Sequence, residues 1–398
     1  MYLTSSEERV LAGERGPALS TAMRLLTTLG DVFDAEKLVR IRSAHVSGVS
    51  YQNIGDAGLE FLENIGDMGA KVSVSTTLNP CGMDRLRWRE FGVPVAYAKK
   101  QLRILSAFER MSLSMTCSCT PYHTGNKPLE GHHVAWSESS ALIFANSVFG
   151  ARTNRESGIS ALASAITGKT PCFGLHNQEN RRPTCLVDVR NEIRTELDYS
   201  ALGYLVGKLL NSGVPFFKGL KTPNQDHLKA LAAGLGASSS IGLFHVGGVT
   251  PEARKISQSQ LESCERLTLQ QDDLDKTVDD LSSETRSDLV FLGCPQTSLN
   301  QLRNIARQLK KKSLKGKLWI CTSRAVYEKA SREGVVGRLE EHGARILCDT
   351  CVEVCQLKEL GVNSILTDSC KAAHYVPSVS DVEVSLRSTS DCLKAAAR

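Results

Sequence analysis

The last third of the chain alternates short apolar runs with helix-like segments. The apolar runs are Asp288–Gly293, Lys317–Cys321, Ala344–Cys348 and Asn363–Thr367. Between them, Leu299–Leu309 and Val326–Leu339 carry apolar residues three and four positions apart, which is the spacing of one helix face. Strands that alternate with helices form parallel sheets, because each helix carries the chain back to the start of the next strand. The pattern therefore predicts an α/β fold with a parallel sheet.

Polar turns that contain serine, threonine or cysteine follow all of these runs. The turns are Cys294–Ser298, Cys321–Ser323, Cys348–Cys351 and Asp368–Lys371. In a right-handed parallel sheet the carboxyl ends of the strands share one edge, where α/β proteins bind their ligands. We therefore expect the four turns to line one crevice.

The length of 398 residues indicates about two α/β domains rather than one core. We expect an N-terminal α/β domain over residues 1–200 and a C-terminal α/β domain over residues 201–398, with an approximate boundary. Candidate binding loops and cysteines, considered below, occur in both.

The N-terminal half is less regular than the last third. It predicts a capped helix over Ser5–Ala12 and strands over His45–Val49 and Lys71–Ser75. The loops Thr76–Asp84 and Cys117–Tyr122 combine turn formers with hydroxyls and thiols, a composition typical of binding loops.

Charge and hydropathy point away from nucleic acid and membrane. The net charge of +5 is small for this length, and the dense basic run Lys310–Lys317 is interpreted as a solvated face. No apolar stretch reaches the roughly 20 residues that a membrane span needs. Met1–Arg9 carries charges where a signal peptide would be apolar. We expect a cytoplasmic protein with no nucleic-acid or membrane partner.

Thirteen cysteines are many for a cytoplasmic chain, and they are spread along the whole sequence. Metal or cluster ligation would explain them, but so would buried apolar thiols. Intracellular disulfides, as in some thermophiles, are a third explanation. Composition alone leaves all three open.

Cys119, Cys294 and Cys351 are far apart in sequence, but each belongs to a loop that could face the same crevice. Three thiolates on an iron–sulfur cluster leave one iron open to polarise a substrate hydroxyl, which is the chemistry of dehydration. A local site for zinc or a cluster on Cys348, Cys351 and Cys355 is the alternative. It is weakened because Cys355 is expected on a helix after Cys351, pointing to the core.

Two arginines, Arg152 and Arg155, follow the helix-like segment Glu138–Ser147. Paired guanidinium groups bind carboxylate or phosphate through two parallel hydrogen bonds, so this segment suits a small anionic substrate. Surface arginines at a helix end are the equally simple alternative.

A set of short motifs, in order from about residue 45 to 375, resembles the aconitase X family. The motifs are His45–Tyr51, Ile54–Glu60, Thr76–Pro80, Gly82–Asp84, Cys119–Tyr122, Asn146–Arg155, Phe244–Glu252, Gly293–Pro295, Asp349–Cys351 and Asp368–Ala372. Together they span nearly the whole chain and are highly specific as a set.

The resemblance implies an aconitase-like, multi-domain α/β architecture of parallel sheets that lacks the small swivel domain. It implies an iron–sulfur cluster, 4Fe-4S favoured, with Cys119, Cys294 and Cys351 as metal ligands. Two departures from the family pattern stand out. Cys370 replaces a usual glycine, and no swivel domain follows Ala373, which implies a separate small subunit in a heterodimer or larger assembly.

Chains divided into large and small subunits resemble the archaeal branch of the family. We therefore expect a hydro-lyase that dehydrates (R)-5-phosphomevalonate to trans-anhydromevalonate 5-phosphate in an archaeal-type mevalonate pathway. A cis-3-hydroxy-L-proline dehydratase is the alternative enzyme. An iron–sulfur redox or iron sensor is the non-enzymatic alternative, but the loops Thr76–Asp84 and Asn146–Arg155 favour an enzyme.

The motifs also suggest roles for individual residues. Ser369, Lys371 and His45 are the expected catalytic residues, although a base is identified by its reach to a proton, which a sequence does not give. The expected substrate-binding residues are Ser50, Tyr51, Thr76, Asn79, Ser139, Asn146, Ser147, Arg152 and Arg155.

Overall fold

The final third of the chain forms a five-stranded parallel sheet in the order β12-β11-β10-β13-β14. The predicted α/β fold with a parallel sheet is confirmed. The strands are β10 (Leu289–Thr297), β11 (Lys317–Thr322), β12 (Ala344–Cys348), β13 (Ser364–Thr367) and β14 (Glu383–Leu386). The helices are α11 (Leu299–Leu309), α12 (Arg324–Arg332), α13 (Val335–Glu341), α14 (Cys370–Ser380) and α15 (Thr389–Ala396).

The prediction of a single helix over Val326–Leu339 is wrong, because this segment forms two helices. α12 ends at Arg332 and α13 begins at Val335. Gly334 between them has φ of 69°, a left-handed conformation that ends helices and that glycine adopts without steric cost.

Both faces of this sheet are covered, which explains why its strands are continuously apolar. Successive strand residues point to opposite faces. Phe291 packs in a core cluster with Trp319, whereas its neighbour Leu292 packs with Ile320 in a second cluster on the other side.

The middle of the chain forms a four-stranded parallel sheet in the order β8-β7-β6-β9. The expected domain boundary near residue 200 lies inside α7, and strands of this one sheet lie on both sides of it in the sequence. The elements are β6 (Cys185–Val189), α7 (Glu196–Leu210), β7 (Pro215–Lys218), α8 (Gln225–Ser238), β8 (His245–Val246), α9 (Gln258–Glu262), β9 (Glu265–Leu269) and α10 (Gln271–Leu281).

The N-terminal region holds a three-stranded parallel sheet, β3-β2-β4, and an antiparallel pair, β1 with β5. The strands are β1 (Leu38–Arg40), β2 (Ser43–Val46), β3 (Ser75–Leu78), β4 (Ala135–Trp136) and β5 (Lys169–Pro171). The helices are α1 (Ser5–Leu11), α2 (Pro17–Val32), α3 (Tyr51–Asp67), α4 (Val95–Arg110), α5 (Ser139–Val148) and α6 (Gly158–Thr167).

The strand predicted over Lys71–Ser75 is wrong, because β3 begins where that prediction ends. The backbone N–H of Val72 donates to the carbonyl of Met111 (3.0 Å) and that of Ser73 to Ala165 (2.8 Å). These N–H groups are therefore used outside the sheet. The strand predicted over His45–Val49 lies two residues earlier, as β2.

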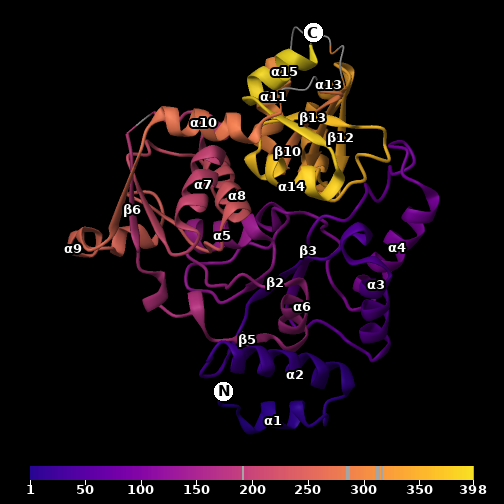
Figure 1. Ribbon diagram of the computed structural model, residues 1–398. Helices are drawn as coiled ribbons and strands as arrows, with labels where there is room; N and C mark the ends of the chain where they lie inside the picture. The colour runs from indigo at the N-terminus through magenta and orange to yellow at the C-terminus, as the bar shows by residue number, and fades with distance from the viewer. Residues whose placement is uncertain (191, 284–286, 310–313, 315–316, 398) are drawn as a thin grey trace.

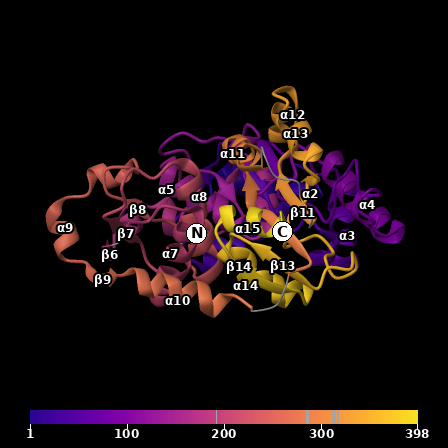
Figure 2. The ribbon, with the colours of Figure 1, turned by 90° about the horizontal axis from the view of Figure 1, so that it is seen from above.

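The structure is a computed structural model that describes residues 1–397 except 191, 284–286, 310–313, 315 and 316. Most of the basic run Lys310–Lys317 lies outside the described residues. In Figures 1 and 2 the C-terminal sheet and its helices lie beside α7 and α8, and the N-terminal helices α1 and α2 lie at the opposite end in Figure 1. Among the described residues, no helix combines the length and apolarity needed to cross a bilayer.

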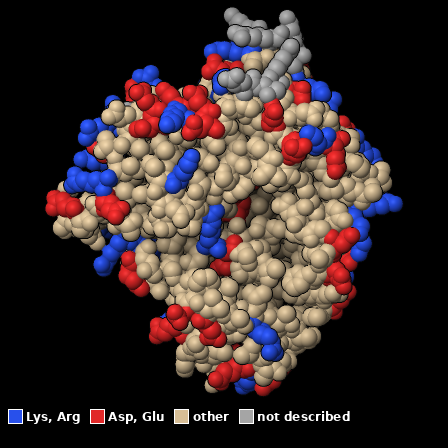
Figure 3. Space-filling model, in the orientation of Figure 1, with Lys and Arg blue, Asp and Glu red and all other residues tan. Residues whose placement is uncertain are grey.

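Charges of both signs are scattered over the face shown in Figure 3. Acidic side chains gather over α10, whose sequence contains five aspartates. The same view shows a hollow between the C-terminal unit and the rest of the molecule.

Strand β10 is irregular at its carboxyl end. Its pairing with β11 shifts between Leu292 and Thr297, and Gly293 in this bulge has φ of 105°. A Cβ atom at Gly293 would lie 2.3 Å from the carbonyl oxygen of Cys321. The chain reverses its winding direction at β10 and β13, and such a switch point is where α/β proteins form binding crevices.

Gly293→Ala should therefore destabilise the C-terminal sheet by about 2 kcal/mol or more, because strain and a backbone clash add. We expect the apparent melting temperature in calorimetry to fall by several degrees. Gly337→Ala is the matched control, since nothing lies within 4 Å of its Cβ position in α13. An unchanged melting temperature in Gly293→Ala would contradict this account of the bulge.

Candidate active site

Strand ends from two sheets meet around one cavity of about 290 Å³. Asn79 and Glu138 follow β3 and β4 of the N-terminal sheet, whereas Cys351 and Lys371 follow β12 and β13 of the C-terminal sheet. We call it the thiol cavity, and its lining residues are Asn53, Asn79, Pro80, Cys119, Glu138, Cys294, Pro295, Cys351, Glu353, Val354, Lys371, Tyr375 and Val379.

Three thiols from distant parts of the chain line this cavity: Cys119, Cys294 and Cys351. Cys294 lies in the bulge of β10, and Cys351 lies three residues beyond β12. The loop of Cys119 continues beside β3, because the N–H of Ser118 donates to the carbonyl of Leu78 (2.8 Å). Of the four turns expected to share one crevice, the one after β11 does not reach this cavity, since its Cys321 is packed in the core.

Burial keeps the three thiols protonated in the metal-free chain. It raises the pKa of Cys119 to about 12, and it raises those of Cys294 and Cys351 well above their ordinary value. The nearby carboxylate of Glu353 raises the pKa of Cys294 and Cys351 further. A thiol binds metal as a thiolate, so metal binding here must release protons.

The thiol cavity offers soft sulfur donors, the ligands that iron–sulfur clusters take. Three thiols from distant loops line it. In an iron–sulfur cluster each thiolate binds a different iron, so the ligands surround the group rather than meet at a point. The thiol cavity therefore fits an iron–sulfur cluster with three cysteine ligands.

Lys371 is a buried cation in the wall of the cavity, 4% exposed. Its ammonium lies 2.5 Å from Glu138 Oε1 and 3.6 Å from Glu353 Oε1. Burial alone would lower the pKa of Lys371, but the two carboxylates outweigh it and the pKa lies well above its ordinary value. Burial would raise the pKa of Glu138, but Lys371 and two hydrogen bonds hold it at about 2. Both groups are charged at neutral pH.

His45 is fully buried in β2, and its Nδ1 lies 2.9 Å from the hydroxyl of Thr77. Its Nε2 has no hydrogen-bond partner in the described chain. Burial lowers the pKa of His45 to about 4, although Glu138 and Asn79 raise it, so the ring is neutral at pH 7. The N–H of Ser137 donates to the His45 carbonyl (3.0 Å) and that of Asn79 to the Val46 carbonyl (2.9 Å), so β2 runs beside the segments that carry the cavity residues Glu138 and Asn79.

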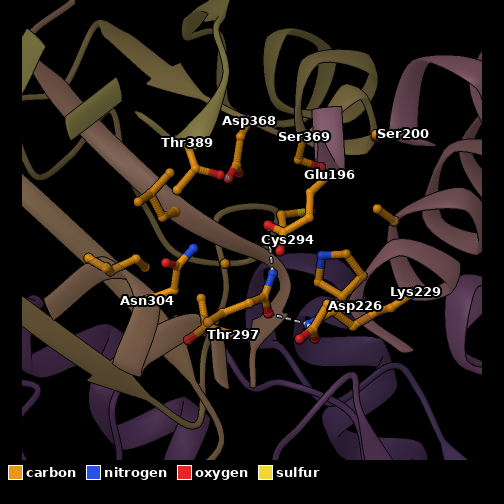
Figure 4. A pocket seen from close by; sticks show the side chains of 16 residues that line it. Glu196, Ser200, Asp226, Lys229, Cys294, Thr297, Asn304, Asp368, Ser369 and Thr389 are labelled. Atoms are coloured by element: carbon orange, nitrogen blue, oxygen red, sulfur yellow. Dashed lines mark hydrogen bonds and ion pairs between the residues drawn. The ribbon is translucent and has the colours of Figure 1, made fainter. Parts of the chain in front are cut away.

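Ser369 caps α14, because its hydroxyl accepts the N–H of Ala372 (3.2 Å). It lines a second, smaller cavity of about 30 Å³, whose wall also includes Cys294 (Figure 4). Its position fixes the first turn of α14, from which Lys371 projects.

The structure does not bring Arg152 and Arg155 into the thiol cavity. Arg152 donates to the carbonyl of His176 (2.8 Å) and to the side chain of Gln178. Arg155 donates to the carbonyls of Ser239 and Gly236. It lines a separate cleft of about 500 Å³.

Of the remaining expected substrate-binding residues, Asn79 lines the thiol cavity, and the others divide into two groups. Ser50 and Ser139 lie behind the cavity wall: Ser50 donates to the carbonyl of Val354 (3.4 Å), and Ser139 to Glu138 (3.4 Å). The others make local contacts. These are Tyr51 with Asp56, Thr76 with the Val74 carbonyl, Asn146 with Thr153 and Gly242, and Ser147 with the Phe244 N–H.

The other cysteines lie outside the thiol cavity. The helix expected after Cys351 is wrong, since a turn replaces it, but Cys355 is packed in the core as expected. The N–H of Cys370 donates to Ser200 (3.1 Å), and its thiol is buried. All thirteen cysteines are free, so disulfides do not account for them.

Sequence reasoning missed two acidic residues of the site, Glu138 and Glu353. Glu138 is the N-cap of α5 and accepts the N–H of Ala141, a role that a glutamate rarely takes. Glu353 stands two residues after Cys351 and accepts the thiol of Cys294 (2.9 Å). Proximity to the proposed ligand Cys351 was the one available signal for Glu353.

Family models match almost the entire chain. The model of the first aconitase X domain matches residues 1–179, that of the second 183–279, and that of the third 287–398. The chain belongs to the aconitase X family. The crystal structure of aconitase X from Thermococcus kodakaraensis, in its holo form, has a TM-score of 0.93 and 44% identity, and each chain is covered completely.

Two kinds of dehydratase are among the proteins similar to this chain. The phosphomevalonate dehydratase large subunit of Methanothermobacter thermautotrophicus is 48% identical, over 95% of this chain and 94% of that protein. Its counterpart in Methanocaldococcus jannaschii is 44% identical, over 99% and 100%. The cis-3-hydroxy-L-proline dehydratase of Pseudomonas aeruginosa is 36% identical, over 99% of this chain and 70% of that protein.

Cys351→Ser is expected to strip iron from the chain purified without oxygen, because a hydroxyl is a far weaker ligand for iron than a thiolate. Cys119→Ser and Cys294→Ser should do the same. Iron and sulfide analysis measures the loss. Cys264→Ser and Cys392→Ser, which change thiols outside the cavity, should retain full iron. Full iron content in Cys351→Ser would exclude this thiol as a ligand.

Proposed function

We propose that this chain is the large, catalytic subunit of a phosphomevalonate dehydratase, which removes water from (R)-5-phosphomevalonate. The observation that carries the proposal is the thiol cavity, where three thiols face a buried Lys371 held by two carboxylates. Four archaeal relatives of that name, 41–48% identical over nearly the whole chain, support this substrate.

Cys119, Cys294 and Cys351 would hold an iron–sulfur cluster, 4Fe-4S favoured. When bound, the cluster supplies a Lewis acid for the hydroxyl that leaves. Each of these three thiol residues is less than a tenth exposed, so polar groups beside them act in a medium of lower dielectric constant than bulk water.

Lys371 would attract the carboxylate of the substrate. Its ammonium is already charged at neutral pH and is anchored by Glu138, so little reorganisation is needed when an anion enters. Ser369 would act through Lys371 by capping α14. Asn79, whose side-chain oxygen has no partner in the described structure, would orient the substrate in the cavity.

His45 is our proposal for the group that accepts the proton. A neutral imidazole with a free Nε2 can take a proton, and the nearby charge of Glu138 favours the resulting cation. His45 lies behind the cavity lining, so Nε2 must reach the substrate past Asn79 or Glu138.

A separate small subunit would complete the site. Relatives are named as large subunits, which supports a heterodimer or larger assembly. Lys371 is the single cation among the described lining residues and is assigned above to the substrate carboxylate, so this lining offers no second cation for the phosphate. We therefore assign the substrate phosphate to groups of the small subunit, with Arg152 and Arg155 outside the cavity.

The complex reconstituted with its small subunit should dehydrate mevalonate 5-phosphate at least about a hundredfold faster than unphosphorylated mevalonate, because a lost buried charge contact costs a few kcal/mol. Measured kcat/KM values for these two compounds and for cis-3-hydroxyproline test this. Faster turnover of hydroxyproline would overturn the substrate but leave the hydro-lyase assignment intact.

The isolated chain, loaded with its cluster, should be nearly inactive. With one side of the cavity uncovered, water enters and the anionic substrate lacks its phosphate partner. Titration with the small subunit should restore turnover up to a fixed molar ratio. Robust turnover by the chain alone would show that the partner is not needed.

A further inference from the structure

Lys229 is a buried lysine of α8 that lies outside the lining of the thiol cavity. It is 2% exposed. Its ammonium donates to the side-chain oxygen of Gln301 (2.5 Å) and to the backbone carbonyl of Gln296 (3.1 Å), and it pairs with Asp226 at 3.1 Å. Figure 4 shows Lys229 and Asp226 on one side of the small cavity and Asp368 on the other, with Cys294 between them.

A buried ammonium is costly, and an apolar side chain of similar length would pack in the same place without desolvation. Lys229 has three acceptors, and one of them belongs to the segment that carries Cys294. Asp226 is itself fixed by the hydroxyl of Ser298 (2.9 Å), which closes the same segment. The ammonium of Lys229 therefore binds the carboxyl end of β10.

Gln296, the residue that Lys229 contacts, connects all three thiol loops. It stands two residues after Cys294 and is fully buried. Its backbone N–H donates to the thiol sulfur of Cys119 (3.3 Å). Its side-chain amide donates to the carbonyl of Thr350 (2.9 Å), next to Cys351.

We propose that Lys229 and Gln296 are positioning residues for the iron–sulfur cluster. Lys229 holds the Gln296 segment in place. Gln296 in turn links the three thiol loops by hydrogen bonds, one of which is the bond from its N–H to Cys119. This inference rests on the proposed cluster. Hydrogen bonds to ligand sulfurs and nearby charges are the terms by which proteins set the reduction potential of such clusters.

The first test needs no cluster. Amide hydrogen exchange in the cluster-free chain, followed for the peptide over residues 294–298, should be about tenfold faster in Lys229→Met than in wild type. Lys255→Met is the matched control, because Lys255 is exposed and pairs with Glu130 on the surface. Unchanged exchange in Lys229→Met would overturn the contact between Lys229 and the thiol loops.

The second test measures the reduction potential of the reconstituted cluster by redox titration with electron paramagnetic resonance. Lys229→Met should lower the potential, because it removes a positive charge and loosens the N–H bond to sulfur. Asp226→Asn should raise it, because it removes a negative charge and leaves Lys229 in place. A merely structural role would not move the two variants in opposite directions.

Lys229→Gln is a second variant, in case Lys229→Met does not fold. Its amide can still donate to the Gln296 carbonyl, but it carries no charge. It should keep more of the exchange protection than Lys229→Met but still lower the potential. Equal potentials in wild type, Lys229→Gln and Asp226→Asn would overturn the proposal. A wild-type chain that takes up no iron would instead overturn the proposed function, together with the claim about potential.

Discussion

The ion pair between Lys371 and Glu138 is the contact on which the site depends. It joins residues 233 positions apart, one at the start of α14 and the other at the start of α5. Both side chains are almost completely buried, so each charge would be strongly destabilising without the other. The pair therefore holds the ends of the two sheets in one arrangement, in which the cavity has its shape.

Lys371 also explains why two carboxylates, those of Glu138 and Glu353, can lie in the wall of one buried cavity. Glu353 accepts the thiol of Cys294 and lies 3.6 Å from Lys371, so one ammonium offsets two carboxylates. Burial keeps the three thiols neutral when no metal is bound, as their raised pKa values indicate. The proposed cluster would displace these three protons, because thiols bind iron as thiolates, and the thiolates would balance the positive charge of its core.

The regular part of the fold could be predicted because its signals are local. Strands β10 to β13 and helix α11 follow apolar periodicity, and the cysteines after them follow from the geometry of a parallel sheet. Glu138 could not be found this way, since its partner Lys371 is distant in sequence. Arg152 and Arg155 look like anion ligands in sequence, but their guanidinium groups donate to backbone carbonyls outside the thiol cavity.

The site lies at a junction of two sheets, so its shape depends on how the two sheets are placed relative to each other. The loops that form the cavity are joined by hydrogen bonds of Gln296 and by the ion pair of Lys371 with Glu138. Such contacts are directional, so a small displacement of one sheet breaks several at once. The buried polar contacts therefore specify one relative placement of the sheets, where apolar packing would tolerate several, and in that placement the three thiols would surround the proposed cluster.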